Sequence, residues 1–230
     1  VEAYDVMIAP IVSSAKAARI ICSAWEKRFG RDPDFIVVEG SLAGGHLGFS
    51  RDELESGTAR DLPSIVGDVI GMLKKLGKEI PVFGAGGIAD SRDVESLLEI
   101  GARGVQIATP FIATEECDAS DGFKQILLEA EEKDVVLLQS PVGMPGRGLF
   151  TPLIRNVEQG KRIPPQRCIQ CISTCNPATT PYCINQALID GFYGKYETGL
   201  FFCGGHVGQV KNMSTVADRI EELAGGWRKK

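Results

Sequence analysis

The chain has 230 residues, of which 43% are hydrophobic and 24% charged, and its mean hydropathy is close to zero. This composition is typical of a globular protein of one domain or one and a half, and it excludes extensive disorder. The net charge of -5, without runs of like charge, argues against nucleic acid or an anionic membrane as a partner. No apolar stretch reaches the ~18 residues of a membrane span, so we expect a cytoplasmic protein.

Apolar runs of strand length alternate with amphipathic helical patterns in the first half of the chain. Ser13 and Ser14 offer an N-cap to an Ala-rich helix, and Asp61 with Pro63 opens a helix that Gly77 closes. The predicted strands are 6–12, 35–39, 80–85 and 104–107, and the predicted helices are 15–28, 61–76 and 91–100.

The strand starts lie 29, 45 and 24 residues apart, which suits right-handed crossovers between parallel strands and not hairpins. The sequence therefore predicts the α/β class. Two architectures stay open, an open doubly wound sheet and part of a (β/α)8 TIM barrel, of which four units would be half. Because Val1, and not Met, directly precedes the first apolar strand, we expect that an N-terminal part is missing.

The pattern becomes irregular from Asp121 onward. Helices are expected near 123–130 and 216–223, with an apolar run at 135–138. The segment 140–148 is too rich in Pro and Gly for a strand, so it is either a lid whose Arg147 meets an anionic substrate or a stiff connection. We predict two domains, a barrel half at 1–120 and a cysteine-containing extension packed on it at 121–230.

Three clusters of small or polar residues follow predicted strands at their carboxyl ends: AGGHLG at 43–48, GAGG at 84–87 and Ala108-Thr109. In parallel α/β folds, this edge is where ligands bind. Gly86 and Gly87 can present backbone N–H groups and a helix N-terminus to an anion, although two glycines can also simply make a tight turn.

His46 is one of two histidines and is flanked by small residues, a setting that suits a base accessible to substrate near neutral pH. The alternative is a histidine that only holds its loop by a hydrogen bond. Glu39, at the end of the preceding strand, either binds a hydroxyl group or is a satisfied residue at the strand end.

Seven cysteines are an odd number, and five lie in the last third of the chain, which is a poor fit to a secreted disulfide framework. The spacing of Cys168, Cys171, Cys175 and Cys183 is one that iron–sulfur or zinc ligands use. We favour reduced cysteines that pack an irregular segment, and hence predict no metal. Another string, CGGHVG at 203–208, repeats AGGHLG without a preceding strand, so we attribute it to chance and regard His206 as structural or exposed.

Six strings of the sequence form a recognisable series: PIVSSAKAA (10–18), FIVVEGSLAGGHLGF (35–49), PVFGAGGIADSRDV (81–94), GARGVQIATPFIATEECDA (101–119), SPVGMPGRG (140–148) and TPYCINQALIDGFYGKYETGLFFCG (180–204). In these strings the chain resembles the nitronate monooxygenase family, whose members are FMN-binding TIM-barrel enzymes, over nearly its whole length and in the right order. The resemblance implies the C-terminal two-thirds of such a protein, with the last four strands of the barrel.

This resemblance implies that His46 is the catalytic base. It also implies that the loops around positions 46, 87 and 109 converge on one rim to hold FMN. The implied cofactor-binding residues are Glu39, Gly44 and Gly45 near the flavin, and Gly86, Gly87, Ala108 and Thr109 at its phosphate.

Two departures from the family pattern bear on this assignment. Family members usually read GTRF where this chain has ATPF, and Pro110 removes both a donor and a cation. Some members also carry a lysine where this chain has Pro10, whereas Lys16 is expected on the solvated surface.

The implied reaction is the oxidation of alkyl nitronates or nitroalkanes by O2 to a carbonyl compound and nitrite. Two alternatives stay open: an FMN-dependent enoyl-acyl carrier protein reductase or another NAD(P)H-dependent flavin oxidoreductase, and an inactive partial chain or metal-binding module. As a half barrel the chain would expose strand edges, so we expect it to pair with the missing N-terminal half or to form a homo-oligomer.

Overall fold

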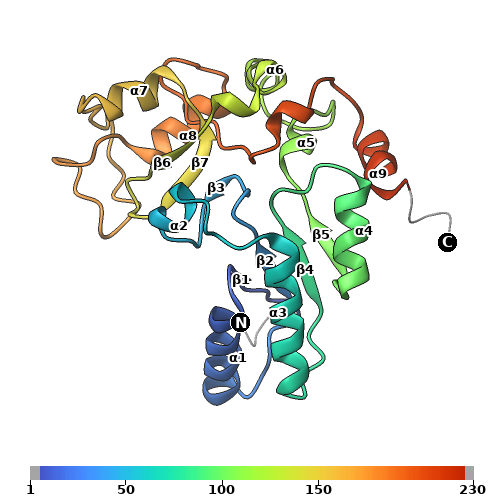
Figure 1. Cartoon of the computed structure of the whole chain (residues 1–230). Helices are drawn as coiled ribbons and strands as arrows, with labels where there is room; N and C mark the ends of the chain where they lie inside the picture. The colour runs from blue at the N-terminus through green and yellow to red at the C-terminus, as the bar shows by residue number, and fades with distance from the viewer. Residues whose placement is uncertain (1–5, 226–230) are drawn as a thin grey trace. The chain divides into compact units, whose positions relative to one another are not determined.

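The structure is a computed structural model in which residues 6–225 are described (Figure 1). The chain forms two compact units. The first unit comprises the residues up to Ala43, 48–107 and those from Ile220 on, and the second unit comprises 44–47 and 108–219. These units divide the chain near residue 107, and the domain boundary predicted at 120 stays a prediction.

The first unit contains a four-stranded parallel sheet with the order β1-β2-β4-β5. This confirms the predicted α/β class with parallel strands. Its strands are β1 (Ile11–Val12), β2 (Ile36–Glu39), β4 (Val82–Ala85) and β5 (Gly104–Gln106), and its helices are α1 (Ala15–Phe29), α2 (Arg51–Glu55), α3 (Leu62–Lys75) and α4 (Ser91–Ile100).

The first predicted strand is shorter than its apolar run. Only Ile11 and Val12 pair with β2, so the prediction of a strand over 6–12 is wrong for its first five residues. Pro10 has no N–H for a ladder, and the N–H of Ile8 donates to the Asp34 carboxylate at 2.7 Å instead of to a strand.

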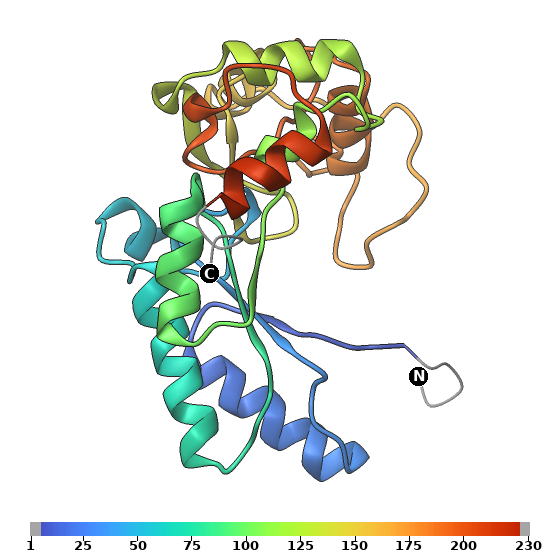
Figure 2. The ribbon, with the colours of Figure 1, turned by 90° about the vertical axis from the view of Figure 1, so that its right-hand side faces the viewer.

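Strand order in the first unit bears on the two architectures that the sequence leaves open. The strands are neighbours in the order in which they occur in the chain, without the reversal that marks a doubly wound sheet. Right-handed crossovers then place the helices on one face, and α3 indeed contacts both α1 and α4 (Figures 1 and 2). This order favours a barrel segment.

The core of the first unit lies between this sheet and its helices. Ile36 and Val38 of β2 pack against Val66 and Val69 of α3, and all four are fully buried. Burial of each such side chain contributes about 1.5–3 kcal/mol. Since side chains alternate along a strand, Glu39 lies on the face away from the helices, at the carboxyl end of β2.

Local capping explains why the helices of the first unit begin where the sequence predicts. The side chains of Ser14, Asp61 and Asp90 accept N–H groups of the first turns of α1, α3 and α4. Gly101 ends α4 in the left-handed conformation with φ of 108°, which favours glycine.

The second unit contains an antiparallel sheet with the order β3-β7-β6. Its strands are β3 (Gly45–His46), β6 (Val135–Gln139) and β7 (Pro145–Leu149). Its helices are α5 (Thr109–Ile112), α6 (Asp121–Glu129), α7 (Pro152–Glu158) and α8 (Ile184–Phe192), with the short 3-10 turns η1 (Glu132–Asp134) and η2 (Val207–Gln209); α9 (Val216–Ala224) ends the described chain.

The helices predicted near 123–130 and 216–223 are confirmed as α6 and α9. The sequence did not predict α7 and α8. Within residues 6–225, every helix is too short or too polar to traverse a lipid bilayer.

The prediction that 140–148 contains no strand is wrong. Residues 145–149 form β7, the central strand of the sheet, and a turn at 140–144 joins it to β6. Gly148 is required because the backbone of Phe201 approaches this strand closely: a Cβ at Gly148 would lie 2.5 Å from the carbonyl oxygen of Phe201. Pro145 stands at the first position of the strand, where a missing N–H is tolerated.

A buried carboxylate on α8 predicts an acid-sensitive contact. Asp190 is 6% exposed and accepts hydrogen bonds from Gln186 at 3.0 Å and Lys195 at 2.9 Å. Burial by itself raises the pKa of Asp190, but the hydrogen bonds from Lys195, Thr198 and Gln186 lower it overall. The stabilisation is therefore present above the unfolded-state pKa of about 4 and is lost as the pH falls below it.

We expect Asp190→Asn to cost about 1.5–3 kcal/mol of unfolding free energy at pH 7, because a charge-assisted hydrogen bond is lost. Urea unfolding of both proteins at pH 7 and pH 3 measures this cost. The difference should shrink at pH 3, and an unchanged difference would rule out the ionised carboxylate as its source.

Candidate functional site

His46 lies in the second unit, on the short strand β3 beside β7. Its Nε2 is 2.7 Å from the Oγ of Ser140, which is 3% exposed, and its ring contacts Phe202 edge-on with 5.3 Å between centroids. Partial burial lowers the pKa of His46 below its ordinary value of 6.5. The imidazole is therefore neutral at neutral pH, as a general base requires.

Gly44 and Gly45 shape the backbone just before His46. A Cβ at Gly44 would lie 2.5 Å from the carbonyl carbon of Cys203, so glycine is needed for this close approach. Gly45 adopts φ of +82°, and a Cβ there would meet nothing within 4 Å. The space at the Cβ position of Gly45 is therefore open.

Thr109 and Ala108 lie at the start of α5, also in the second unit. The Thr109 Oγ1 accepts the N–H of Gly204 at 2.9 Å, so Thr109 and Gly44 both contact the segment 203–204. Ala108 has φ of -123°, a conformation that alanine adopts without strain. The structure thus brings the predicted residues at 44 and 109 to one segment of the chain.

The sequence reasoning missed the role of this segment by attributing the CGGH string to chance. The signal available was the small residue at position 44, because the backbone of Cys203 and Gly204 lies where a side chain at Gly44 would stand. His206 is partly exposed, and its Nδ1 is 3.3 Å from the carboxylate of Glu132, as expected for a structural residue.

Glu39, Gly86 and Gly87 lie in the first unit. Burial raises the pKa of Glu39, and a hydrogen bond from the N–H of Gly48 at 3.4 Å opposes the rise. Gly86 and Gly87 have φ of +82° and +77°, and side chains there would collide with Ala43 and Leu42. Within residues 6–225, no hydrogen bond uses the N–H of either glycine, so both amides can donate to an anion.

The N-terminus of α4 is less available to an anion than the sequence suggests. The Asp90 carboxylate accepts the N–H groups of Arg92 and Asp93, and the Asp93 carboxylate accepts the N–H of Ala89 at 2.8 Å. Two carboxylates of the chain therefore already occupy the positive end of the helix. A phosphate beside this turn would depend on the amides of Gly86 and Gly87.

Arg147 stands opposite Gly45 in the ladder, while His46 stands opposite Gly146. Since directly opposed residues share a face, the side chains of Arg147 and His46 leave the sheet on opposite faces. Burial lowers the pKa of Arg147, and burial raises the pKa of Cys203 to about 12. Cys203 is therefore a neutral thiol, and the idea of a mobile lid that carries Arg147 does not fit a central strand.

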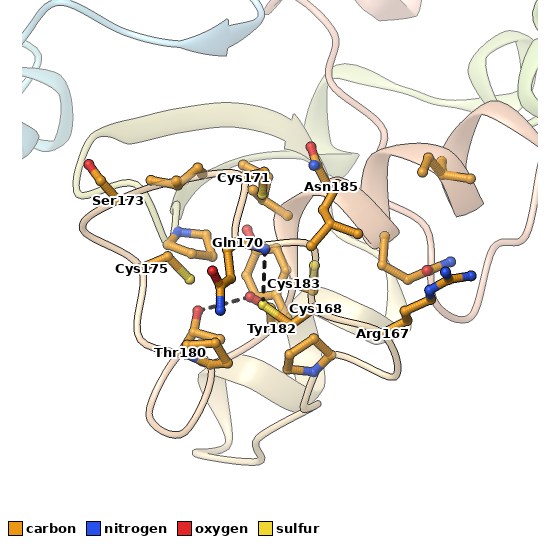
Figure 3. A pocket seen from close by; sticks show the side chains of 18 residues that line it. Arg167, Cys168, Gln170, Cys171, Ser173, Cys175, Thr180, Tyr182, Cys183 and Asn185 are labelled. Atoms are coloured by element: carbon orange, nitrogen blue, oxygen red, sulfur yellow. Dashed lines mark hydrogen bonds between the residues drawn. The ribbon is translucent and has the colours of Figure 1, made fainter.

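The four clustered cysteines line one cavity of about 520 Å³ in the second unit (Figure 3). All four are free thiols; Cys168 and Cys171 are exposed, and Cys175 and Cys183 are partly buried. Within residues 6–225, no three His, Cys, Asp or Glu side chains are grouped so that they could hold a metal ion.

Comparison with known proteins identifies related chains. The model of the family described as nitronate monooxygenase matches residues 1–226. A probable nitronate monooxygenase of Staphylococcus saprophyticus is 32% identical over 127 residues, and one of Staphylococcus aureus is 35% identical over 130 residues. Each of these matches covers 55% of this chain and 34% of the relative, so the chain matches about a third of the length of these curated relatives.

Two solved structures are similar over nearly the whole chain. FabK from Thermotoga maritima is 25% identical with a TM-score of 0.73, covering 99% of this chain and 63% of its own. A nitroalkane oxidase from Streptomyces ansochromogenes is 20% identical with a TM-score of 0.70, covering 97% and 58%, and supports the fold alone.

Proposed function

Because this chain belongs to the nitronate monooxygenase family, we propose that it is the His46-bearing part of an FMN-dependent TIM-barrel oxidoreductase. The proposed reaction oxidises alkyl nitronates or nitroalkanes with O2 to a carbonyl compound and nitrite. The family is one of flavin-dependent oxidoreductases, and FMN as the flavin, O2 as the oxidant and the substrate class are parts of the proposal.

The observation that carries this proposal is the contact between His46 and Ser140. In the tautomer that is competent as a base, Nε2–H donates to the Ser140 Oγ at 2.7 Å. Nδ1 makes no hydrogen bond with any residue in the described part of the chain, so its lone pair can accept the α-proton of a nitroalkane. An anionic nitronate needs no such step, and there the imidazolium would anchor the anion.

The residues present fit a flavin. The Cβ position of Gly45 is open space, and the amides of Gly86 and Gly87 are donors without a partner in residues 6–225. We assign Glu39, Gly44 and Gly45 to the flavin, and Gly86, Gly87, Ala108 and Thr109 to its phosphate. FMN, when bound, supplies electron transfer and reaction with oxygen. This assignment requires the loops around 46, 87 and 109 to meet at one rim.

The lowered pKa of His46 predicts the pH dependence of turnover. A base must be unprotonated, so kcat/KM for a neutral nitroalkane should fall as the pH drops through the pKa of His46, with a midpoint below 6.5. A pH profile of nitrite release between pH 5 and 8 measures it, with the preformed nitronate as the control. A midpoint at or above pH 7 would exclude this histidine as the base.

A second candidate function is reduction of a carbon–carbon double bond with NAD(P)H as the reductant. It is supported by the similarity to FabK and to the enoyl reductase domain of MlnA from Bacillus amyloliquefaciens, which is 16% identical with a TM-score of 0.52. Oxidation of NADH in the absence of nitronate distinguishes the two. Nitrite release from nitronate with consumption of O2 supports the first function, and NADH-dependent reduction of an enoyl thioester supports the second.

A further inference from the structure

We propose that Cys168, Cys171, Cys175 and Cys183 bind a [4Fe–4S] cluster in the cavity that they line in the second unit. The inference does not depend on the flavin chemistry, because it concerns a different set of side chains and a different ligand. It revises the sequence-based preference for reduced cysteines without metal, and it takes up the ligand type that their spacing indicates.

The side chains that line this cavity include the ligands that an iron–sulfur cluster needs. Four free thiols within sixteen residues surround one cavity, and thiolate sulfur is the ligand that iron–sulfur clusters require (Figure 3). Reduced cysteines that merely pack a core are usually buried, whereas Cys168 and Cys171 are exposed. These thiols are accessible to incoming metal.

The hydroxyl group of Tyr182 is buried beside the cavity and has no hydrogen-bond partner among the described residues. Tyr182 is 1% exposed and lines the cavity, and its hydroxyl group makes no hydrogen bond with the described residues. Figure 3 shows its side chain among Cys168, Cys171 and Cys183. A buried hydroxyl without a partner is costly, and a sulfur of a bound cluster would accept a hydrogen bond from it.

The arrangement of the cysteines bears on whether they would hold a cluster or a single ion. Zinc–sulfur bonds of about 2.3 Å in a tetrahedron require sulfur atoms roughly 3.8 Å apart. In residues 6–225, no three His, Cys, Asp or Glu side chains are grouped so that they could hold one metal ion, although four cysteines line the same cavity. A cluster places iron and sulfide between its ligands, so its four thiolates stand farther apart and surround a larger space. The cavity of about 520 Å³ is far larger than one ion needs.

The charge and the backbone of the segment agree with a thiolate-bound cluster. Among the described residues that line the cavity, Arg167 is the only one with a charged side chain, and its positive charge would offset part of the negative charge that four thiolates bring. The N–H of Gln170 donates to the Sγ of Cys168 at 3.4 Å. On binding, each thiol loses its proton and forms one iron–sulfur bond.

The segment that carries the first three cysteines is a loop whose two ends are tied together. No helix or strand lies between α7 and α8. Its two ends are held together by the bridge between Ile163 and Tyr182 and by the Arg162 guanidinium, which donates to the carbonyl of Thr180 at 3.0 Å.

The cavity also adjoins the candidate active site through the chain. Pro141 lines it, and the preceding residue, Ser140, holds the His46 ring at 2.7 Å. A cluster that orders this turn would therefore help to position the proposed base.

The test is anaerobic reconstitution of the full chain with ferric iron, sulfide and a thiol reductant that reduces part of the iron to the ferrous state, followed by iron and sulfide analysis and Mössbauer spectroscopy. We expect about four iron and four sulfide ions per chain. Cys171→Ser and Cys183→Ser should each lower bound iron at least about tenfold, whereas Cys117→Ser, at a cysteine outside the cavity, should leave it unchanged. One zinc per chain, no metal, or equal iron in all variants would overturn the proposal.

A measurement on the unmutated chain keeps the test valid if a variant fails to fold. Alkylation followed by mass spectrometry should show the four cysteines protected in the reconstituted protein and reactive after chelation, with Cys117 equally reactive in both. Equal reactivity of the four before and after chelation would contradict the proposal, as would disulfides among them.

Tyr182→Phe tests whether the Tyr182 hydroxyl group contacts the cluster, because the reduction potential of the cluster should change only if it does. Loss of its O–H donor should leave four iron ions bound but shift the reduction potential of the cluster to a more negative value. Tyr193→Phe, at a tyrosine 62% exposed and outside the cavity, is the matched control and should leave the potential unchanged. Equal potentials in both variants would show that Tyr182 does not face the cluster.

Discussion

His46→Gln should lower kcat/KM for a neutral nitroalkane by about 10²- to 10⁴-fold while it lowers turnover of the preformed nitronate far less. The reason is that only the neutral substrate needs a base, and in the proposed tautomer Nδ1 of His46 carries the lone pair that can accept the α-proton. Nitrite release from the two forms of one nitroalkane, measured with wild type and variant under identical conditions, gives the ratio.

Ser140→Ala is the matched variant for this prediction. It leaves the imidazole in place but removes the hydroxyl group whose oxygen lies 2.7 Å from Nε2. We expect an intermediate loss on the neutral nitroalkane, with a changed pH midpoint because the ring loses its hydrogen-bond partner. If His46→Gln lowers turnover of both substrate forms equally, the residue anchors or folds the site and is not its base.

Gly44→Ala should destabilise the second unit by about 2–3 kcal/mol, because its Cβ would overlap backbone that has little freedom to move. The three atoms that this Cβ would meet are the carbonyl carbon and oxygen of Cys203 and the nitrogen of Gly204, at 2.5, 2.7 and 2.8 Å. Displacement of Gly204 would also break its hydrogen bond to Thr109. Urea unfolding monitored by circular dichroism measures the loss.

Gly160→Ala is the control for the general cost of replacing a glycine in this unit. Its φ is +76°, and a Cβ there would meet nothing within 4 Å, so it reports backbone strain of about 1 kcal/mol without a collision. An equal or smaller loss for Gly44→Ala would mean that the segment 203–204 moves freely and does not fix this loop.

Local physics explains what the sequence predicts well. The caps Ser14, Asp61 and Asp90 and the 3.6-residue periodicity lie within each helix, so α1, α3 and α4 begin within about one residue of the predicted positions. Consecutive crossovers likewise predict the parallel sheet. These features need no knowledge of distant residues.

Tertiary contacts explain what the sequence does not predict. Gly148 reads as a strand breaker, yet β7 needs it because Phe201 approaches so closely. Gly191 has the same effect in α8, where a Cβ would lie 2.4 Å from the carbonyl oxygen of Leu200. In both cases glycine serves packing by residues that lie farther along the chain.

The candidate site shows the same division. His46 stands out in the sequence because small residues flank it, but Ser140, its partner in the structure, lies 94 residues away. Thr109 and Gly204 are 95 residues apart. Such pairs carry no local signal, so the sequence predicts His46 as a candidate base and does not predict its hydrogen-bond partner.

The most direct test of the central claim is the amount of FMN that the protein holds. After incubation with excess FMN and removal of the free cofactor, denaturation should release close to one FMN per chain, and Gly87→Val should release much less. Absence of FMN from the wild type, or equal amounts from both proteins, would contradict a flavin site built on these glycines.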